Sequence, residues 1–289
     1  MYEVMQVASK AQHFDPRQVM LREDFEIFHY REPKAAEVEI HHHDFYEIYL
    51  LLGGQVEYWV DGSLYKLDAG DIFLISPMEL HRPMVHPKSQ YERIVLWVNK
   101  DYLESCSQDG IDLAACFRAG FNMIRPADTK YASISARLLE LVREDGGREP
   151  GNRLAARGIF LQFMVELNRI AAADLARQPR RKQGSNLIGK VLSYINEHSN
   201  EPLSLDELAG RFYVSKYYLS HEFSRETGVS VYRYIMLKRL LTAKQLLSGG
   251  MPAGEACYKC GFKDYAGFYR AFKAEYGISP KHFAAAQIL

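Results

Sequence analysis

The 289-residue sequence has few cysteines: four, spread over the chain. Disulfide frameworks need short chains with closely spaced cysteines, so we expect reduced thiols, as in a cytoplasmic protein. No run approaches about 18 consecutive apolar residues, so no membrane-spanning helix is expected. The first residues show neither the basic nor the apolar segment of a secretory signal peptide, which also favours the cytoplasm.

The chain also lacks a net charge, because 36 basic residues balance 36 acidic ones, but the balance is not local. Residues 1–176 carry 19 Lys and Arg against 27 Asp and Glu, whereas residues 186–289 carry 13 against 9. Residues 177–185 add four basic residues and no acidic ones. An acidic N-terminal part and a basic C-terminal part predict two domains with different partners, the C-terminal one binding a polyanion.

The front of the chain, from about residue 19 to 98, consists of short segments rich in β-branched and aromatic residues, separated by turn formers such as Asp61-Gly62. Short strands with no helical pattern between them predict an antiparallel sandwich or barrel. The expected strands are 38–41, 47–52, 56–60, 72–75 and 93–98.

The middle of the chain is helical by its apolar periodicity. Residues 131–145 place apolar side chains on one face and stop at Gly146. The next helix, 152–177, is apolar around much of its circumference, so it either buries a subunit contact or simply lies between the sheet and its neighbour. Residues 177–185 have no such periodicity and predict a linker.

The last part, from residue 186, is predicted to be all-α. Ser204, Ser215, Ser230 and Asp264 have the residue types of helix N-caps, and glycines follow several of the helices. The whole chain then divides into an all-β barrel (1–110), a helical dimerisation segment (111–176), the linker (177–185) and the α-helical domain (186–289).

This last part also contains an internal repeat. The segment from Leu208 to Ser230 corresponds to the segment from Ala256 to Ser279, each with a short helix, a tight turn and a longer capped helix. That is the layout of a helix-turn-helix unit, whose second helix lies in the major groove of DNA. The long helix between the copies, 231–247, would place the two recognition helices in successive grooves about 34 Å apart.

The repeat region resembles the DNA-binding domain of AraC/XylS transcription regulators over about 100 residues. The matching residues are Leu205-x-x-Leu208-Ala209, Ser215-x3-Leu219-x3-Phe223-x4-Gly228-x-Ser230, Arg239-Leu240-x2-Ala243-x2-Leu246-Leu247 and Gly261-Phe262-x-Asp264-x3-Phe268-x-Arg270-x-Phe272-Lys273-x3-Gly277-x-Ser279-Pro280. Ala256-Cys257 departs from the family's usual Ile-Ala. We therefore expect Cys257 to be a buried apolar thiol and, with Cys260, not a metal or redox site.

Apolar residues four apart, Leu219 with Phe223 and Phe268 with Phe272, are expected to pack inward. The opposite face would contact DNA through Lys216, Tyr217, Ser220, His221, Ser224, Lys263, Tyr265, Ala266, Tyr269, Arg270 and Lys273. The resemblance implies base reading by the tyrosines, Ser220, His221, Ala266 and Arg270, and an arginine can bind a guanine edge with two hydrogen bonds. The lysines would contact phosphates, which position the protein without specifying sequence.

The front region carries His41-x-His43-x3-Glu47-x6-Gly54 and then Gly70-Asp71-x5-Pro77-x3-His81. These resemble the two motifs of a cupin, the jelly-roll-like sensor fold that precedes many AraC-type DNA-binding domains. In metal-binding cupins the corresponding residues hold a divalent ion, here His41, His43, Glu47 and His81. Strand alternation would place His41 and His43 on one face. The alternative is that these residues bind an effector directly, without metal, and the sequence leaves both open.

Aromatic residues on the same strands, Tyr49, Trp59 and Trp97, would complete an effector pocket with those four residues, or else simply fill the barrel. The prediction is a non-enzymatic, homodimeric regulator that binds double-stranded operator DNA and RNA polymerase under control of a small effector, by family a carbohydrate. Two alternatives remain: a metal-dependent cupin enzyme, such as a dioxygenase or isomerase, and a ligand-independent dimeric regulator. The sequence does not distinguish activation from repression.

Overall fold

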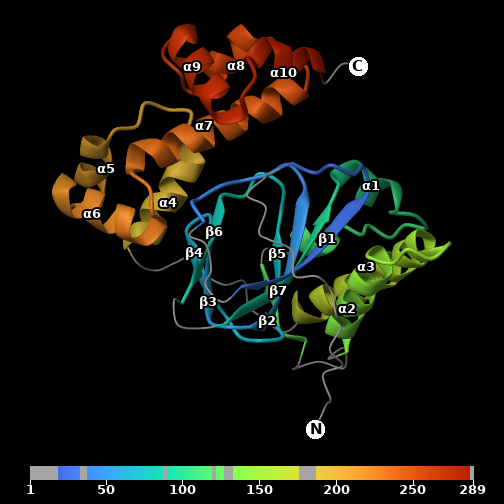
Figure 1. The fold of residues 1–289 in the computed structure, drawn as a ribbon. Coiled ribbons are helices and arrows are strands. Elements are labelled where there is room, and N and C mark those ends of the chain that lie inside the picture. The colour runs from blue at the N-terminus through green and yellow to red at the C-terminus, as the bar shows by residue number, and fades with distance from the viewer. Residues whose placement is uncertain are drawn as a thin grey trace. The chain divides into compact units, whose positions relative to one another are not determined.

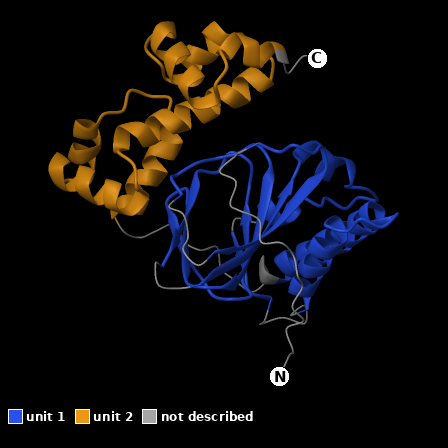
Figure 2. Ribbon diagram, in the orientation of Figure 1, with its two compact units in different colours: residues 1–181 blue, residues 182–289 orange. Residues whose placement is uncertain are grey.

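The computed structural model describes residues 19–32, 38–86, 90–118, 122–126, 133–175 and 187–286. The chain divides into two compact units, residues 1–181 and 182–289 (Figure 2). The linker predicted at 177–185 lies outside the described residues. Among the helices that the structure describes, none is long and apolar enough to cross a membrane.

The first unit is built on two antiparallel sheets, which confirms the expected all-β fold for the front of the chain (Figure 1). The larger sheet has the order β1 (Phe25–Glu32), β7 (Tyr91–Val98), β2 (Tyr46–Gly53), β5 (Ile72–Ile75) and β8 (Met123–Ile124). The smaller sheet has the order β4 (Ser63–Leu67), β3 (Val56–Val60) and β6 (His81–Val85). Because β8 pairs with β5, the larger sheet extends past residue 110.

Strand β2 is buried on both faces. Tyr46, Ile48 and Leu50 belong to the core under the helices, while Tyr49 and Leu51 belong to the core between the two sheets. Strand β7 alternates in the same way. A strand covered on both sides must be almost continuously apolar, which explains the run Ile48 to Leu51.

The described residues of the first unit also form the helices α1 (Lys100–Ser105), α2 (Ile134–Asp145) and α3 (Asn152–Leu175) and the 3-10 turn η1 (Ala115–Arg118). Helices α2 and α3 pack together against the outer face of the larger sheet. Phe160 of α3 stacks on Phe25 of β1, with ring centroids 4.8 Å apart. Truncating a buried phenylalanine of this kind typically costs about 3–5 kcal/mol of stability.

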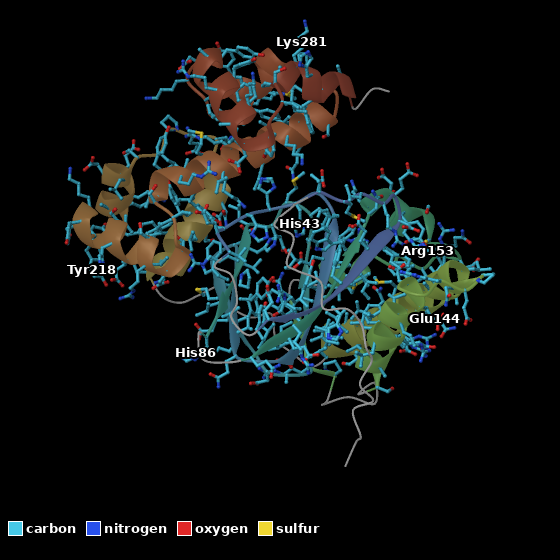
Figure 3. The ribbon with its side chains drawn as sticks, in the orientation of Figure 1. His43, His86, Glu144, Arg153, Tyr218 and Lys281 are labelled. Atoms are coloured by element: carbon cyan, nitrogen blue, oxygen red, sulfur yellow. The ribbon has the colours of Figure 1, made fainter. Side chains whose placement is uncertain are left out.

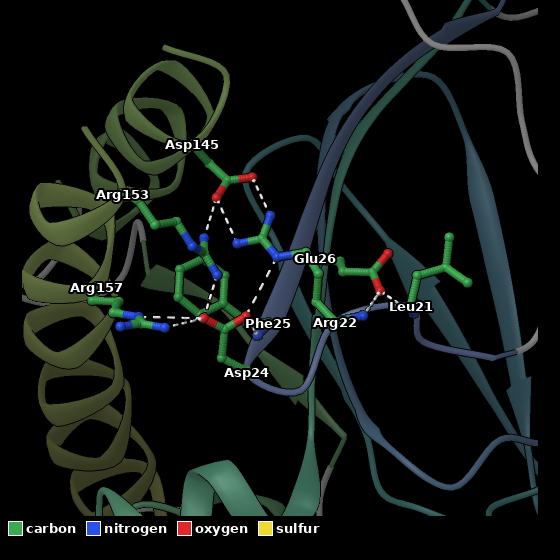
Figure 4. Close-up of polar contacts among 8 residues, drawn as sticks. All are labelled: Leu21, Arg22, Asp24, Phe25, Glu26, Asp145, Arg153 and Arg157. Carbon is green, nitrogen blue, oxygen red and sulfur yellow. Dashed lines mark hydrogen bonds and ion pairs between the residues drawn. The ribbon is translucent and has the colours of Figure 1, made fainter. Parts of the chain in front are cut away.

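A network of charged residues ties the ends of α2 and α3 to the start of β1 (Figure 4). Asp24 accepts hydrogen bonds from the guanidinium groups of Arg153 and Arg157, while Asp145 accepts two from Arg22 at 3.0 Å and one from Arg153. Both carboxylates are largely buried, so each needs these donors to offset its lost hydration.

Two features of the first unit differ from the sequence-based expectation. Residues 38–40 are irregular and His41 forms only an isolated bridge to His81, so the strand predicted at 38–41 is wrong. Strands β1, β4, β6 and β8 were not among the predicted strands. Strand β4 mixes exposed Leu64 and Lys66 with buried Tyr65 and Leu67, and β6 contains a proline, so neither shows a simple apolar run.

The second unit is entirely helical in its described part, as expected. Its helices are α4 (Leu187–His198), α5 (Leu205–Arg211), α6 (Lys216–Thr227), α7 (Val231–Ser248), α8 (Ala253–Lys259), α9 (Tyr265–Tyr276) and α10 (Pro280–Ala286). All four predicted N-caps are confirmed, because the side chains of Ser204, Ser215, Ser230 and Asp264 each accept a hydrogen bond from a backbone N–H three residues on. Gly228 and Gly277 end α6 and α9 in the left-handed conformation.

Helix α7 connects the two helix-turn-helix units, α5–α6 and α8–α9 (Figure 1). Its residues Leu240, Ala243 and Leu247 belong to the core around the second helix-turn-helix, α8–α9. Cys257 lies buried in that core, which confirms its prediction as a buried thiol. Cys260 is buried there too, and burial raises its pKa to about 12.

Candidate effector site and nucleic-acid interface

A cluster of buried polar side chains lies between the two sheets of the first unit. Strand β2 contributes Glu47, β6 contributes His81, and the irregular segment before β2 contributes His41 and His43. One ligand atom each of His43, Glu47 and His81 lie within 4.8 Å of one another. His43 lies among the strands of this unit in Figure 3.

The three histidines share one hydrogen-bonding pattern. The Nδ1 atoms of His41, His43 and His81 each donate to a backbone carbonyl two residues away, at 2.8–2.9 Å. Because a carbonyl can only accept, each Nδ1 carries the proton. In the neutral imidazole the Nε2 atom is then a lone-pair acceptor, and this is the tautomer that metal-binding or ligand-accepting histidines adopt.

Two of these Nε2 atoms, on His43 and His81, are buried without a hydrogen-bond partner in the described part of the chain. The Nε2 of His43 lies 3.3 Å from Oε2 of Glu47, which is the distance of an ion pair but lacks hydrogen-bond alignment. A buried polar atom without a partner costs about 1–3 kcal/mol. The cluster can therefore accept a ligand that supplies donors or positive charge.

Glu47 is held in the ionised form. Burial alone would raise the pKa of its carboxyl, but the neighbouring imidazoles of His43 and His41 and the indole N–H of Trp97 outweigh burial and lower that pKa. The Trp97 Nε1 donates to Oε2 at 3.0 Å, and the Tyr58 hydroxyl donates to Oε1 at 3.4 Å. Burial in turn lowers the pKa of His81 well below its ordinary value, so this imidazole is neutral.

Aromatic rings surround the cluster. Trp97 packs between Phe45 and Phe28 with centroids 4.7 and 4.9 Å away, and Tyr49 lies edge-on to Tyr58. Tyr49 also donates a hydrogen bond to the Tyr91 hydroxyl at 2.7 Å, and burial raises the pKa of both phenols.

Of the residues that the sequence placed in an effector pocket, Trp59 alone does not join this interior cluster. Val56, Tyr58 and Val60 face the space between the sheets, and alternation places Trp59 on the other face of β3. The neighbouring Tyr58, which the sequence reasoning missed, contacts Glu47 instead. The polar Glu57 in the same strand was the available signal, because it marks the face of β3 that points away from the cluster, and the buried Trp59 shares that face.

His41 and His43 converge as expected, but not because of strand alternation. The segment between them is irregular: a β-bridge forms at His41, which exchanges two hydrogen bonds with His81, and the His43 carbonyl accepts one from the Met78 N–H. Their ring centroids lie 6.3 Å apart, and His41 lies 4.2 Å from the ring of His81. His41 is only half-buried, so it stands at the edge of the cluster.

In the second unit, α6 and α9 each pair a buried apolar face with an accessible polar face. Leu219, Phe223, Phe268 and Phe272 are fully buried. The residues proposed to contact DNA are exposed or half-buried: Lys216, Tyr217, Ser220, His221, Ser224, Lys263, Tyr265, Ala266, Tyr269, Arg270 and Lys273.

A hollow of about 490 Å³ follows the accessible face of α6. It is lined by Tyr217, Ser220, His221, Ser224 and also Arg225, which the sequence reasoning did not single out. The ring of Tyr217 is 81% exposed, so it is accessible to a partner. Tyr218 projects from the surface beside it (Figure 3).

Comparison with known proteins assigns both units. The family model of the AraC-like ligand binding domain matches residues 24–164, and that of a helix-turn-helix domain matches residues 208–286. The HTH-type transcriptional activator RhaS of Salmonella schwarzengrund is 26% identical over 265 residues, covering 87% of this chain and 88% of RhaS. RhaS of Salmonella paratyphi B is 27% identical over 267 residues, with the same coverage.

Among solved structures, ToxT from Vibrio cholerae matches 91% of this chain and 98% of its own, with 13% identity and a TM-score of 0.37. The two family models, in this order along the chain, and curated relatives that match both units together agree with the helix-turn-helix repeat and the two-sheet domain described above. The chain belongs to the AraC family of transcription regulators, with an N-terminal ligand-binding domain and a C-terminal helix-turn-helix DNA-binding domain.

Proposed function

We propose that the regulator responds to a small polyhydroxylated effector, a sugar or sugar derivative, bound at the interior cluster of the first unit. The observation that carries this is the chemistry of the cluster. The ionised carboxylate of Glu47 and the buried Nε2 of the neutral His81 are both acceptors, so the cluster favours a ligand rich in donors. Hydroxyl groups supply such donors, whereas an anionic effector would meet the negative charge of Glu47.

The aromatic rings support the same class of ligand. A sugar presents C–H groups on one side of its ring and hydroxyls around its edge, which matches a pocket of aromatic faces with a few converging polar groups. Trp97 and Tyr49 supply such faces, and Tyr58 and Glu47 supply polar groups. The effector set is therefore His41, His43, Glu47, Tyr49, Tyr58, His81 and Trp97.

A divalent metal ion is the second candidate for the cluster. His43, Glu47 and His81 already converge, and His41 stands at the edge as a fourth ligand. Imidazole and carboxylate together suit Zn²⁺, Mn²⁺, Fe²⁺ or Ni²⁺, and the carbonyl bonds at the three Nδ1 atoms orient the rings as outer-shell partners do. A bound ion would supply positive charge to the effector's hydroxyl oxygens.

We also propose that the protein is a homodimer formed through α3. Leu154 is 74% exposed and Leu161 39% exposed, and they lie on one stripe with Gly158 and the half-buried Val165. These positions repeat with alternating spacings of four and three, the pattern of a helix pair. A side chain at Gly158 would meet nothing within 4 Å, so a second helix can approach the backbone closely there.

The regulatory mechanism follows from these parts. The effector shifts the arrangement of the two units only if it binds one arrangement more tightly than another. The relatives are transcriptional activators by name, and we propose that this chain likewise activates transcription, through RNA polymerase at the promoter, in the cytoplasm. DNA contact is assigned to the accessible faces of α6 and α9.

The effector proposal predicts stabilisation by neutral polyols. At a concentration 100 times its dissociation constant, a ligand stabilises the folded state by about 2.7 kcal/mol, or roughly 5–10 °C for a unit of this size. A thermal-shift screen of the full chain against monosaccharides, sugar alcohols and sugar acids checks this. We expect Glu47→Gln to abolish the shift and the surface variant Glu57→Gln to retain it. Stabilisation by sugar acids alone, or equal shifts in both variants, would contradict the assignment.

The metal candidate predicts that chelator-treated protein takes up a stoichiometric amount of a divalent ion. His81→Gln should weaken uptake by at least about 10-fold, because it removes a ligand outright where even outer-shell changes have such effects. The control is His86→Gln, at an exposed histidine outside the cluster. Equilibrium dialysis followed by elemental analysis measures both. Full sugar binding by metal-free protein, with no uptake of metal, would eliminate this candidate.

The dimer proposal predicts that Leu161→Lys yields a monomer. A charge in the centre of an apolar helix pair loses its hydration without gaining a partner. Light scattering of the full chain at several concentrations gives the mass. Ser105→Lys introduces the same charge at an exposed position on α1 and should leave the dimer intact. A dimeric Leu161→Lys protein would place the interface elsewhere.

The DNA assignment predicts that substitutions in α9 and in the turn before it weaken DNA binding in different ways. Arg270→Ala should weaken binding to a selected operator by about 1–3 kcal/mol and leave random DNA unaffected, because a base contact is lost. Lys263→Ala should weaken both and reduce the salt dependence by about one counterion, because a phosphate contact is lost. Titrations on both duplexes at several salt concentrations separate the two. Equal defects for both variants would contradict these roles.

A further inference from the structure

Within the second unit, the two helix-turn-helix halves contact each other at a place outside both recognition helices. The segment 199–201, which follows α4, lies between the middle of α7 and the turn that follows α8. The recognition helices α6 and α9 belong to opposite halves of the repeat, so any contact between the halves governs their separation.

Arg239 holds one side of this segment. From α7, its Nε donates to the carbonyl of Ser199 at 2.7 Å and its Nη2 donates to the carbonyl of Glu201 at 2.8 Å. Two donors in one rigid guanidinium plane fix both the distance and the orientation of the segment, which a lysine ammonium does less well.

Gly261 forms the other side of the contact. Its φ is +90°, and a Cβ built on it would lie 2.6 Å from the carbonyl oxygen of Asn200 and 2.9 Å from the Asn200 Cα. The backbones of the two halves therefore touch directly, at a distance that only glycine allows. A side chain there would have to displace backbone atoms, because no flexible group lies in its way.

A second connection joins the same halves but is weaker. Arg233, at the start of α7, donates to Glu275 near the end of α9 at 2.8 Å. Arg233 is about half exposed, and solvent and salt screen such pairs. The backbone contact at Gly261 and the paired carbonyl bonds of Arg239 are thus the stiffer connection.

We propose that Arg239 and Gly261 are positioning residues that fix the separation of α6 and α9, so that operator spacing is part of the specificity of this regulator. This inference rests on the proposed insertion of both helices into DNA. With this contact intact, affinity for DNA depends on the distance between the two half-sites of the operator as well as on their sequences. Without it, α7 alone joins the halves and the spacing requirement relaxes.

The experiment measures affinity against spacing. Duplexes selected from a random pool by the full-length chain supply the operator, and derivatives carry one or two added base pairs between its half-sites. Each added pair moves the far groove by about 3.4 Å and rotates it around the axis. Wild-type affinity should fall on the order of 100-fold, because losing one recognition helix forfeits about half of the specific binding free energy.

Two variants and two matched controls test whether Arg239 and Gly261 fix the separation of α6 and α9. Arg239→Met keeps the apolar stem and removes both donors, and Gly261→Ala introduces the clash. For both variants we expect the inserted base pairs to lower DNA affinity by less than about 10-fold. Without the contact, each helix-turn-helix half can move with the major groove that it binds. Lys238→Met, next to Arg239 on α7, and Gly254→Ala, at a glycine with open space around it, should keep the steep dependence. Arg239→Lys should restore part of it.

The results that would contradict this proposal can be distinguished from one another. If Arg239→Met loses affinity equally at every spacing while remaining folded by circular dichroism, the contact only supports stability and the proposal is wrong. If the wild-type chain itself tolerates the insertions, the fixed separation is wrong although DNA binding stands. Failure of the DNA-binding assignment itself would show earlier, because no duplex would be enriched from the pool.

Discussion

The two-sided burial of β2 and β7 is the constraint on which the first unit depends. One face of these strands packs under α2 and α3, and the other faces the smaller sheet. Because side chains alternate, the one charged residue within the buried run of β2, Glu47, has to point into the interior. There it receives donors from Trp97 and Tyr58 and lies beside the imidazoles of His43 and His81. The packing that stabilises the domain thus also sets the chemistry of what it binds.

The second unit depends on α7 in a similar way. Tyr234, near its start, packs on Phe223 of α6 and donates to Asn196 of α4, whereas Leu240 and Leu247 pack in the core beneath α9. One helix therefore contributes to the cores of both recognition units. A change in α7 would therefore affect the packing of both α6 and α9, and in our proposal the contact of Arg239 and Gly261 with residues 199–201 adds the connection that fixes their separation.

How much the sequence predicts differs between the two units. The helices from residue 187 onward match closely, because serine caps, an aspartate cap and terminal glycines act through contacts within a few residues. The strands were harder: β4 and β6 are stabilised by pairing with β3, which local patterns do not show. The histidine cluster was expected from the resemblance to cupin motifs, but His41 and His81 are brought together by a long-range bridge that local patterns do not show. Choosing Tyr58 over Trp59 needed only the alternation of β3, which Glu57 already marks.

We propose that one rigid α-helical unit presents two recognition helices to DNA and that the ligand-binding domain controls this unit. Methylation protection of guanine N7 on a selected operator tests it most directly, because N7 lies in the major groove. With the full-length chain and its effector, we expect protection in two successive major grooves, about 10 base pairs apart, on one face of the duplex. Protection confined to a single groove, or a pattern and occupancy unchanged by effector, would contradict it.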